Sequence, residues 1–234
     1  MTRRRKPIVP AQLERRVYEQ LLDDIVGGEL EPGQQLVEAR IAEEFGVSKT
    51  PVREALIRLQ RDGLVEIEPY RGARVLQPAE QDVIEIFELR LCIETHIARE
   101  LAGRQPVEVL TRLRKSIIAS RAALDRRDHR AFLKSLRDFN DAIAAGCGNQ
   151  RMAKVLSELR NVLELIGNTS LRAPGREHRS IDEHEAIASA IERGDPEAAM
   201  RATAEHILSV QRDSLGVPLD GEDEAVAAVS ARAG

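Results

Sequence analysis

Aromatic residues, cysteines and long hydrophobic runs are all scarce in this chain of 234 residues. Aromatics make up 3% of the sequence and tryptophan is absent, while Ala, Leu and Ile are abundant. This composition favours a mostly helical protein and disfavours a β-sandwich. Cys92 and Cys147 are the only cysteines and form no CxxC motif, so we expect free thiols in a reducing cytoplasm. No run of about 18 apolar residues is present that could span a membrane.

A large excess of either charge is also missing. The chain has 35 Lys and Arg against 39 Asp and Glu, for a net charge of −4. This balance excludes a strongly basic protein that coats nucleic acid, so any DNA binding must come from a local basic surface. One basic cluster stands at the N-terminus: Arg3, Arg4, Arg5 and Lys6. No apolar run follows it, so we expect no signal peptide; it is either a solvated tail or an arm that contacts DNA.

Motifs of common catalytic sites are absent as well. The sequence contains no HExxH, no nucleophile elbow, no P-loop and no Rossmann glycine motif. With 42% hydrophobic and 32% charged residues, the chain can nevertheless bury a substantial core. We therefore expect a folded binding protein and not an enzyme.

Residues 45–56 carry the most informative pattern, that of the turn and second helix of a helix-turn-helix. Gly46 suits the tight turn, and Ser48 or Thr50 can cap the next helix by accepting a hydrogen bond from a free backbone N–H. Pro51 falls in the first turn of that helix, where a missing N–H costs little.

This helix has one apolar and one polar face. Apolar residues recur at i, i+3, i+4 and i+7, namely Val52, Ala55, Leu56 and Leu59. The opposite face carries Thr50, Arg53, Ile57 and Arg61. A helix that buries one side and presents a polar N-terminal side is suited to enter a DNA major groove.

The first 76 residues predict a winged helix-turn-helix at residues 11–76, preceded by a flexible basic arm at residues 1–10. A first helix ends at Gly27 and Gly28, and the helices of the motif span residues 37–45 and 48–61. Short strands at residues 64–67 and 73–76 flank a turn that contains Pro69 and Gly72, and form the wing.

Beyond Pro78 the sequence predicts only helices. Six segments repeat apolar residues with the 3.6-residue period of an α-helix: 79–102, 107–126, 129–145, 152–167, 179–191 and 196–215. The predicted fold class is therefore mostly α, a winged helix-turn-helix followed by a bundle of about six helices at residues 79–215. Residues 217–234 are rich in Ala, Asp, Glu and Gly, which predicts a disordered acidic tail.

The N-terminal motifs resemble the GntR family of bacterial transcription regulators. The resemblance rests on Leu30-Glu31-Pro32-Gly33-Gln34-Gln35-Leu36 and on the segment from Gly46 to Leu56, in this order and spacing. Leu59, residues 63–65 and the wing residues continue it over about residues 11–76. It implies that the N-terminus of the recognition helix docks in the major groove and that the wing tip reaches the minor groove.

The resemblance also implies that Lys49, Thr50 and Arg53 contact DNA and that Gly72 forms the wing tip. Ser48 and Arg71, beside them in the sequence, are further DNA-binding candidates. Arg53 can hold a guanine edge with two donors, and Lys49 suits a phosphate or a base. Gly72 lets the backbone approach the duplex closely.

Arg40 is a further DNA-binding candidate. The family often has Arg at the position of Ala39, and a shift of one residue turns a side chain by about 100° around a helix. We interpret Arg58 and Arg61 as solvated surface charges.

The helical half resembles the ligand-sensing FCD domain of the FadR branch of this family, over about residues 79–215. The segments that carry this resemblance are residues 87–90 with Glu94, 139–140, 146–149, 181–187, 194–196 and 205–207. It implies that this domain binds an effector and forms a homodimer.

Many members of this branch hold a divalent metal, often zinc, with one Asp and three His. Here His184 and His206 match two of the histidines, whereas Asn140 stands at the third and Leu136 at the aspartate position. Asp138 points about 160° away from Asn140 around the helix and does not replace the carboxylate. Two His and one Asn are a poor ligand set for zinc, so a metal on these three residues is the less favoured interpretation.

The favoured interpretation is a metal-free effector pocket lined by Arg90, Asn140, His184 and His206. The planar guanidinium of Arg90 suits a carboxylate. A structural salt bridge of Arg90 with Glu88 or Glu94 is the alternative. The remaining histidines fit no ligand pattern and are expected at the surface: His96, His129 and His178.

Together, these features predict a homodimeric regulator, in this family most often a repressor, that binds a palindromic operator in double-stranded DNA. A small metabolite, a carboxylate, would bind the helical domain and favour one dimer geometry over another. Two alternatives stay open, a DNA-binding protein without an effector and a metal-dependent enzyme.

Overall fold

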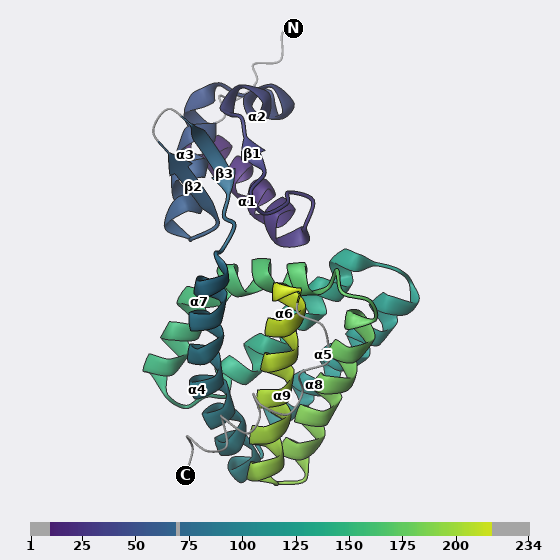
Figure 1. The fold of residues 1–234 in the computed structure, drawn as a ribbon. Helices are drawn as coiled ribbons and strands as arrows, with labels where there is room; N and C mark the ends of the chain where they lie inside the picture. The colour runs from purple at the N-terminus through teal and green to yellow at the C-terminus, as the bar shows by residue number, and fades with distance from the viewer. Residues whose placement is uncertain (1–9, 69–70, 217–234) are drawn as a thin grey trace, which may run out of the picture. The chain divides into compact units, whose positions relative to one another are not determined.

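The computed structural model describes residues 10–68 and 71–216, which divide into two compact units, Met1–Gln77 and Pro78–Gly234 (Figure 1). The predicted basic arm, apart from Pro10, and the predicted acidic tail lie outside the described residues, as do two residues of the wing turn. The mostly helical fold class is confirmed. None of the described helices combines the length and hydrophobicity needed to cross a membrane.

The first unit contains the predicted helix-turn-helix. Its helices are α1 (Pro10–Gly27), α2 (Glu38–Phe45) and α3 (Lys49–Arg61). Gly46 ends α2 with φ of 63°, the left-handed conformation that glycine adopts without a steric penalty. The apolar stripe of α3 is buried as predicted, with Val52, Ala55, Leu56 and Leu59 each at most 1% exposed.

Helix α1 is attached to α3 by a polar contact beside this core. The Tyr18 hydroxyl donates a hydrogen bond of 2.6 Å to Asp62, and the Arg58 guanidinium lies 3.7 Å from the centre of the Tyr18 ring. Burial, together with the hydrogen bond to Asp62, raises the pKa of Tyr18 to about 12. Arg58 is thus more than a solvated charge, because it packs on an aromatic ring and pairs with Glu14.

A three-stranded antiparallel sheet completes this unit, in the order β1-β3-β2. The wing strands are β2 (Val65–Glu68) and β3 (Gly72–Val75), paired from Val65 with Val75 to Glu68 with Gly72. Each wing strand is displaced by one residue from its prediction. Strand β1 (Gln35–Leu36) was not predicted, since two residues are too few to show an alternating pattern.

The second unit forms six helices between residues 80 and 215, confirming the predicted number. They are α4 (Glu80–Arg104), α5 (Val107–Asp125), α6 (His129–Ala145), α7 (Gln150–Ser170), α8 (Arg176–Glu192) and α9 (Pro196–Leu215). Three of them begin at a side chain that accepts a hydrogen bond from the first turn: Asp128, Asn149 and Asp195.

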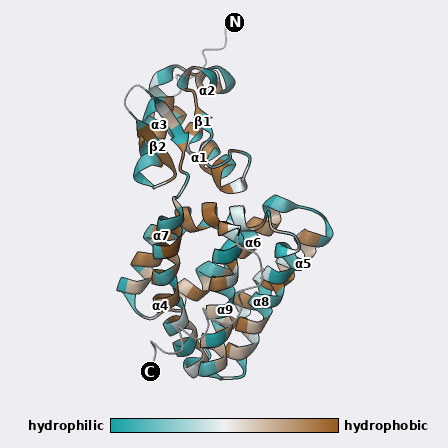
Figure 2. Ribbon diagram, in the orientation of Figure 1, coloured by the Kyte–Doolittle hydropathy of each residue, from teal (hydrophilic) through white to brown (hydrophobic). Residues whose placement is uncertain are grey.

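Apolar side chains from these helices pack into a common core. Hydrophobic and hydrophilic residues share the same helices in Figure 2, as expected when one face of each helix is buried. Fully buried members include Ile97, Leu101, Leu113 and Ile191. Cys147 lies in this core and Cys92 is exposed; both are free thiols, as predicted.

Candidate functional site

The N-terminal turn of α3 presents polar side chains outward. Lys49, Thr50 and Arg53 are exposed, on the side of the helix opposite the buried stripe. Ser48 is also exposed and occupies the N-cap position with an extended backbone, but its side chain makes no capping hydrogen bond. Thr50 lies inside the helix, so the predicted side-chain cap is wrong for both residues. The turn is held by Gly46 and by the burial of Pro51 and Val52.

Arg53 forms a bidentate ion pair with Glu38, at the start of α2. Its Nε donates to Glu38 Oε1 at 3.0 Å and its Nη2 donates to Oε2 at 2.9 Å. These hydrogen bonds lower the pKa of Glu38, with a smaller contribution from the nearby charge of Lys49. The side chain of Arg53 stays 64% exposed, so the pairing leaves much of the guanidinium open to solvent.

The other DNA-binding candidates are also exposed. Arg40 pairs with Glu44 at 2.9 Å along α2, and its side chain is 80% exposed. Arg71 pairs with Glu68 at 3.2 Å across the wing turn. Gly72 has φ of 83°, which a residue with a side chain rarely adopts, and the space that a Cβ would fill is open.

The second unit brings two of the predicted effector residues together. His184 is buried and stacks on Phe139, with ring centres 3.8 Å apart and planes inclined by 2°. The ring of His206 lies 4.8 Å from that of His184. Burial holds the pKa of His184 well below its ordinary value, so this imidazole is neutral.

A buried ionic network joins His206 to α8. Arg176 is fully buried and donates to both carboxylate oxygens of Glu183, at 2.8 and 2.5 Å, and to Ser209 Oγ at 2.6 Å. The Nδ1 atom of His206 lies 2.7 Å from Glu183 Oε2. Burial alone would raise the pKa of Glu183, but the hydrogen bonds from His206 and Arg176 outweigh it and lower the pKa to about 2. Asp213 adds a second carboxylate 3.5 Å from Arg176.

Arg90 is buried and forms an ion pair within α4. Its Nε donates to Glu94 at 2.7 Å, and the guanidinium lies 4.9 Å from the centre of the Phe87 ring. Of the two partners considered for Arg90, the structure selects Glu94. Arg90 also contributes to the electrostatic field at His184, which places it near the histidines.

Asn140 lies apart from this cluster. Its side chain is exposed, whereas its neighbour Phe139 is the α6 residue that contacts His184. Leu136 packs against the hydrophobic core. The three remaining histidines are exposed, as predicted: His96, His129 and His178.

The residues present do not fit a zinc site of one aspartate and three histidines. Leu136 has no donor atom, Asn140 is exposed, and His206 shares Nδ1 with a carboxylate that Arg176 already holds. Across residues 10–68 and 71–216, no three His, Cys, Asp or Glu side chains are placed to hold a metal ion.

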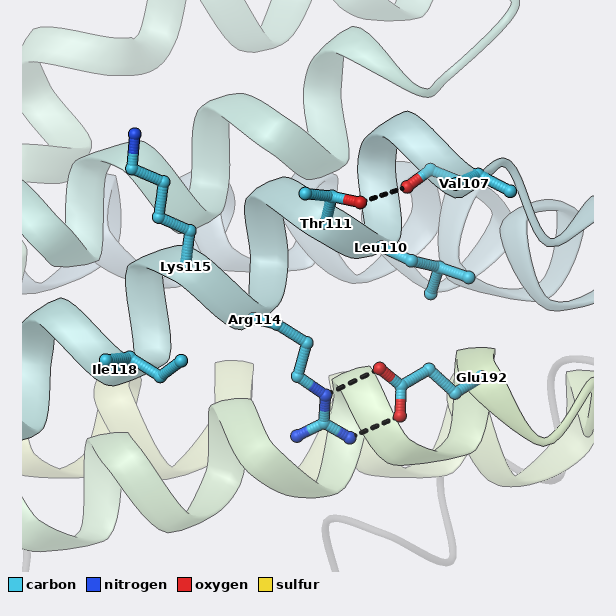
Figure 3. A pocket seen from close by; sticks show the side chains of 7 residues that line it. All are labelled: Val107, Leu110, Thr111, Arg114, Lys115, Ile118 and Glu192. Atoms are coloured by element: carbon cyan, nitrogen blue, oxygen red, sulfur yellow. Dashed lines mark hydrogen bonds and ion pairs between the residues drawn. The ribbon is translucent and has the colours of Figure 1, made fainter.

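A separate surface pocket of 510 Å³ lies between α5 and α8. Arg114 points toward Glu192 and is bonded to it, while Lys115 points the other way (Figure 3). Arg114 also donates to Glu185 and Ser189, so its guanidinium is occupied by the protein itself. None of the predicted effector residues lines this pocket. The rest of its lining is mostly apolar and consists of Val107, Leu110, Thr111 and Ile118.

Four residues of these sites were not predicted. Each of them gains its role only through a partner on another turn or helix: Glu38, Phe139, Arg176 and Glu183. The sequence offered a reason to single out Glu183, because it precedes His184 within the segment that carried the FCD resemblance. The sequence offered no such reason for Arg176, because a charged residue at the start of a helix is usually solvated.

Comparison with known proteins identifies both units. Residues 13–75 match the bacterial regulatory proteins of the gntR family, and residues 85–209 match the FCD domain. The chain is 30% identical to a protein of Paenarthrobacter nicotinovorans described as a probable D-xylose utilization operon transcriptional repressor, over 80% of this chain and 81% of that protein. It is 29% identical to the gluconate operon transcriptional repressor of Bacillus licheniformis, over 80% of this chain and 79% of that protein.

Solved structures share the fold. A GntR transcriptional regulator from Rhodococcus sp. RHA1 superposes with a TM-score of 0.75 at 24% identity, over 88% of this chain and 98% of that chain. E. coli McbR/YncC superposes with a TM-score of 0.68 at 20% identity, over 95% of this chain and 99% of that chain. With an exposed polar face on the recognition helix, a wing beside it and an FCD match over the helical unit, the chain belongs to the GntR family of bacterial regulatory proteins and is a DNA-binding transcriptional regulator, not an enzyme.

Proposed function

We propose that this regulator represses transcription by docking the N-terminus of α3 in the major groove of an operator. The observation that carries the proposal is the exposed set of Lys49, Thr50 and Arg53 on a helix whose other face is buried. Lys49 and Thr50 would contact phosphates or bases, and Arg53 would bind a guanine. Ser48 and Arg40 would add contacts beside the groove. Such a regulator acts where the chromosome is, in the cytoplasm.

The wing would contact the adjacent minor groove. Gly72 opens β3 with a backbone that carries no side chain, and Arg71 is exposed beside it. A bare backbone can approach a phosphate strand closely, and an arginine supplies charge to a narrow groove. This surface would add affinity with little sequence information.

We further propose that the regulator binds a palindromic operator as a homodimer. A two-fold dimer presents two recognition helices to two half-sites related by a dyad. The FCD match over residues 85–209 supports this arrangement, because the resemblance to FCD domains implies a homodimer.

The effector would be a small carboxylate held in the helical unit. The supporting observation is the group of Arg90, His184 and His206, three polar side chains at most 7% exposed, which lie beside the buried ion pairs Arg90–Glu94 and Arg176–Glu183. Asn140 would contribute only through a rearrangement of α6, since it is exposed. The relative named for a gluconate operon makes a sugar acid a reasonable first ligand to test, because gluconate is a carboxylate.

Arginine substitution on α3 tests the docking proposal. A duplex selected by the full chain from a random library serves as the operator. Arg53→Ala should weaken binding to this duplex by about 1–3 kcal/mol and relax the base preference at one position of each half-site. Arg61→Ala is the matched control, an exposed arginine two turns farther along the same helix. If Arg53→Ala bound the selected duplex as tightly as the wild type, the docking proposal would be wrong.

A ligand screen tests the effector proposal separately. Gluconate, other sugar acids and simple carboxylates are added to the full chain, and thermal unfolding and operator affinity are recorded. A true effector should raise the unfolding temperature and change operator affinity by about 5- to 150-fold. His206→Gln should abolish that response while leaving operator binding without ligand intact. If no carboxylate changed either quantity, a DNA-binding protein without an effector would become the better interpretation.

A further inference from the structure

Among residues 10–68 and 71–216, Glu38 is the only carboxylate that is hydrogen-bonded to one of the proposed base-reading side chains, Arg53. It lies in the first turn of α2 and is bonded to Arg53, fifteen residues away on α3. The ammonium of Lys49 also acts electrostatically on it. Glu38 therefore faces two of the cations proposed to contact DNA, which lie four residues apart on one side of α3.

Pairing to Glu38 uses one edge of the Arg53 guanidinium. A guanidinium has five N–H donors in a planar fork. Glu38 accepts from Nε and from Nη2, so two donors are engaged and three remain. Two of the remaining N–H groups, one on each Nη atom, project together from the end of the guanidinium. A guanine presents O6 and N7 on its major-groove edge, which matches two parallel donors.

The same contact restrains an otherwise flexible side chain. An arginine on a helix surface has several rotamers, and ordering such a side chain on binding costs about 0.5–1.5 kcal/mol. Two hydrogen bonds near 3 Å hold the plane of the Arg53 guanidinium before DNA arrives. The carboxylate itself lies near a surface proposed to meet phosphates, where a negative charge opposes binding to any duplex.

We propose that Glu38 is a specificity-determining positioning residue, which holds Arg53 with one edge of its guanidinium free to bind a guanine. It would favour the correct duplex by orienting Arg53 and disfavour all duplexes by its charge. The consequence is a larger ratio of operator affinity to affinity for unrelated DNA, and not simply tighter binding to the operator. This inference rests on the proposed docking of Arg53.

The contact of Arg40 with Glu44 supplies a matched control. It is an exposed arginine–glutamate pair on the same helix as Glu38, with a similar distance of 2.9 Å. Within residues 10–68 and 71–216, Glu44 makes no contact with Arg53 or Lys49, and its partner Arg40 is four residues away on α2. Removing Glu44 deletes the same chemical group without disturbing the proposed base-reading arginine.

A double-mutant cycle in the full chain tests the inference. Affinity for the selected operator and for an unrelated duplex is measured for the wild type, Glu38→Gln, Arg53→Ala, the double variant and Glu44→Gln. Glu38→Gln should lower the ratio of operator to unrelated affinity by about 3- to 10-fold, with affinity for unrelated DNA unchanged or raised. In the Arg53→Ala background the same substitution should leave the ratio unchanged, because Glu38 acts through Arg53. Glu44→Gln should leave the ratio of operator to unrelated affinity unchanged.

Several results would overturn this inference. If Glu38→Gln tightened operator binding and raised the ratio, the carboxylate would compete with DNA for Arg53. If operator and unrelated affinities fell by the same factor along with the unfolding temperature, Glu38 would be a structural residue only. An unchanged ratio would exclude any role in specificity. If Arg53→Ala itself had no effect on operator binding, the docking proposal would fail first, and this inference with it.

Discussion

Arg53 on the recognition helix and Arg176 at the start of α8 are both paired in two places with a glutamate, yet their surroundings are opposite. The side chain of Arg53 is 64% exposed and keeps three donors for another partner. The side chain of Arg176 is 0% exposed and is bonded to Glu183 and Ser209. The same residue type is therefore available for the proposed DNA contact in one unit and holds the fold together in the other.

Solvent exposure determines the energetic weight of each pair. An exposed ion pair contributes about 0–1 kcal/mol, because water screens the charges and both side chains lose freedom. Breaking a buried pair leaves one charge without a partner in the interior, which costs about 3–5 kcal/mol. Substitutions in the first unit should accordingly change DNA binding more than stability, and substitutions in the α8–α9 network should do the reverse.

The largest effect is expected for Arg176→Ala. The substitution leaves the carboxylate of Glu183 buried with only His206 beside it, and should lower the free energy of unfolding by about 3–5 kcal/mol. Urea unfolding followed by circular dichroism measures the loss, and hydrogen exchange of α8 and α9 amides locates it. Arg15→Ala, which breaks an exposed pair with Glu19, should lower the free energy of unfolding far less, because water screens both charges. Similar losses of unfolding free energy in the two variants would contradict the expected difference between a buried and an exposed ion pair.

Acid should destabilise the helical unit through His184. Its folded pKa lies well below the ordinary value of 6.5, so below pH 6.5 the unfolded chain gains a proton that the folded chain does not. Stability is therefore fully present above pH 6.5 and should fall by about 1 kcal/mol between pH 7 and 5.5. Glu183, with its pKa lowered to about 2, adds a loss only below its ordinary value near 4.5.

The variant His184→Phe isolates this contribution. A phenyl ring can keep the stack on Phe139 but cannot titrate. Thermal unfolding recorded at pH 7 and 5.5 should show a smaller difference for the variant than for the wild type. An equal difference in both proteins would show that another group carries the acid sensitivity.

A smaller effect is expected at the wing. Arg71→Ala should weaken binding to operator and unrelated DNA by a similar factor, because a wing arginine would meet phosphates or a groove and not a particular base. The slope of log affinity against log salt concentration should decrease by about 1. Loss of discrimination between duplexes would instead assign Arg71 a direct role in base recognition.

The smallest effect on stability is expected at Arg40. Arg40→Ala removes an exposed i,i+4 pair with Glu44 and should cost less than about 0.5 kcal/mol. Operator affinity should fall less than for Arg53→Ala, because Arg40 already turns along α2 toward Glu44. A loss equal to that of Arg53→Ala would place Arg40 among the base-reading residues.

Most of the elements could be predicted because helices and turns depend on neighbouring residues. The repeat of Val52, Ala55, Leu56 and Leu59 identified the buried face of α3, and Gly46 identified the turn before it. The strand β1 could not be predicted, since two residues at Gln35 and Leu36 acquire strand geometry only by pairing with β3. The prediction of a side-chain cap at Ser48 failed because the residue type fits but its hydroxyl makes no capping bond.

The sites were less predictable than the elements. Resemblance supplied Arg53, Arg90, His184 and His206, but it did not show that Arg90 pairs with Glu94 or that Asn140 is exposed. Those facts depend on how α4, α6, α8 and α9 turn against one another in the core. A rotation of one residue on a helix moves a side chain by about 100°, which is enough to exchange Phe139 for Asn140 beside His184.

By itself, the sequence determined the class of protein, the two-part organisation and the polar face of the recognition helix, since these follow from local periodicity and short motifs. Only the tertiary structure decided the partners of the charged residues. Glu38 meets Arg53 across 15 residues, and Arg176 meets Ser209 across 33. Packing brings such residues together and sets the exposure of each pair, and exposure decides whether an arginine remains available to DNA or is consumed in holding the fold.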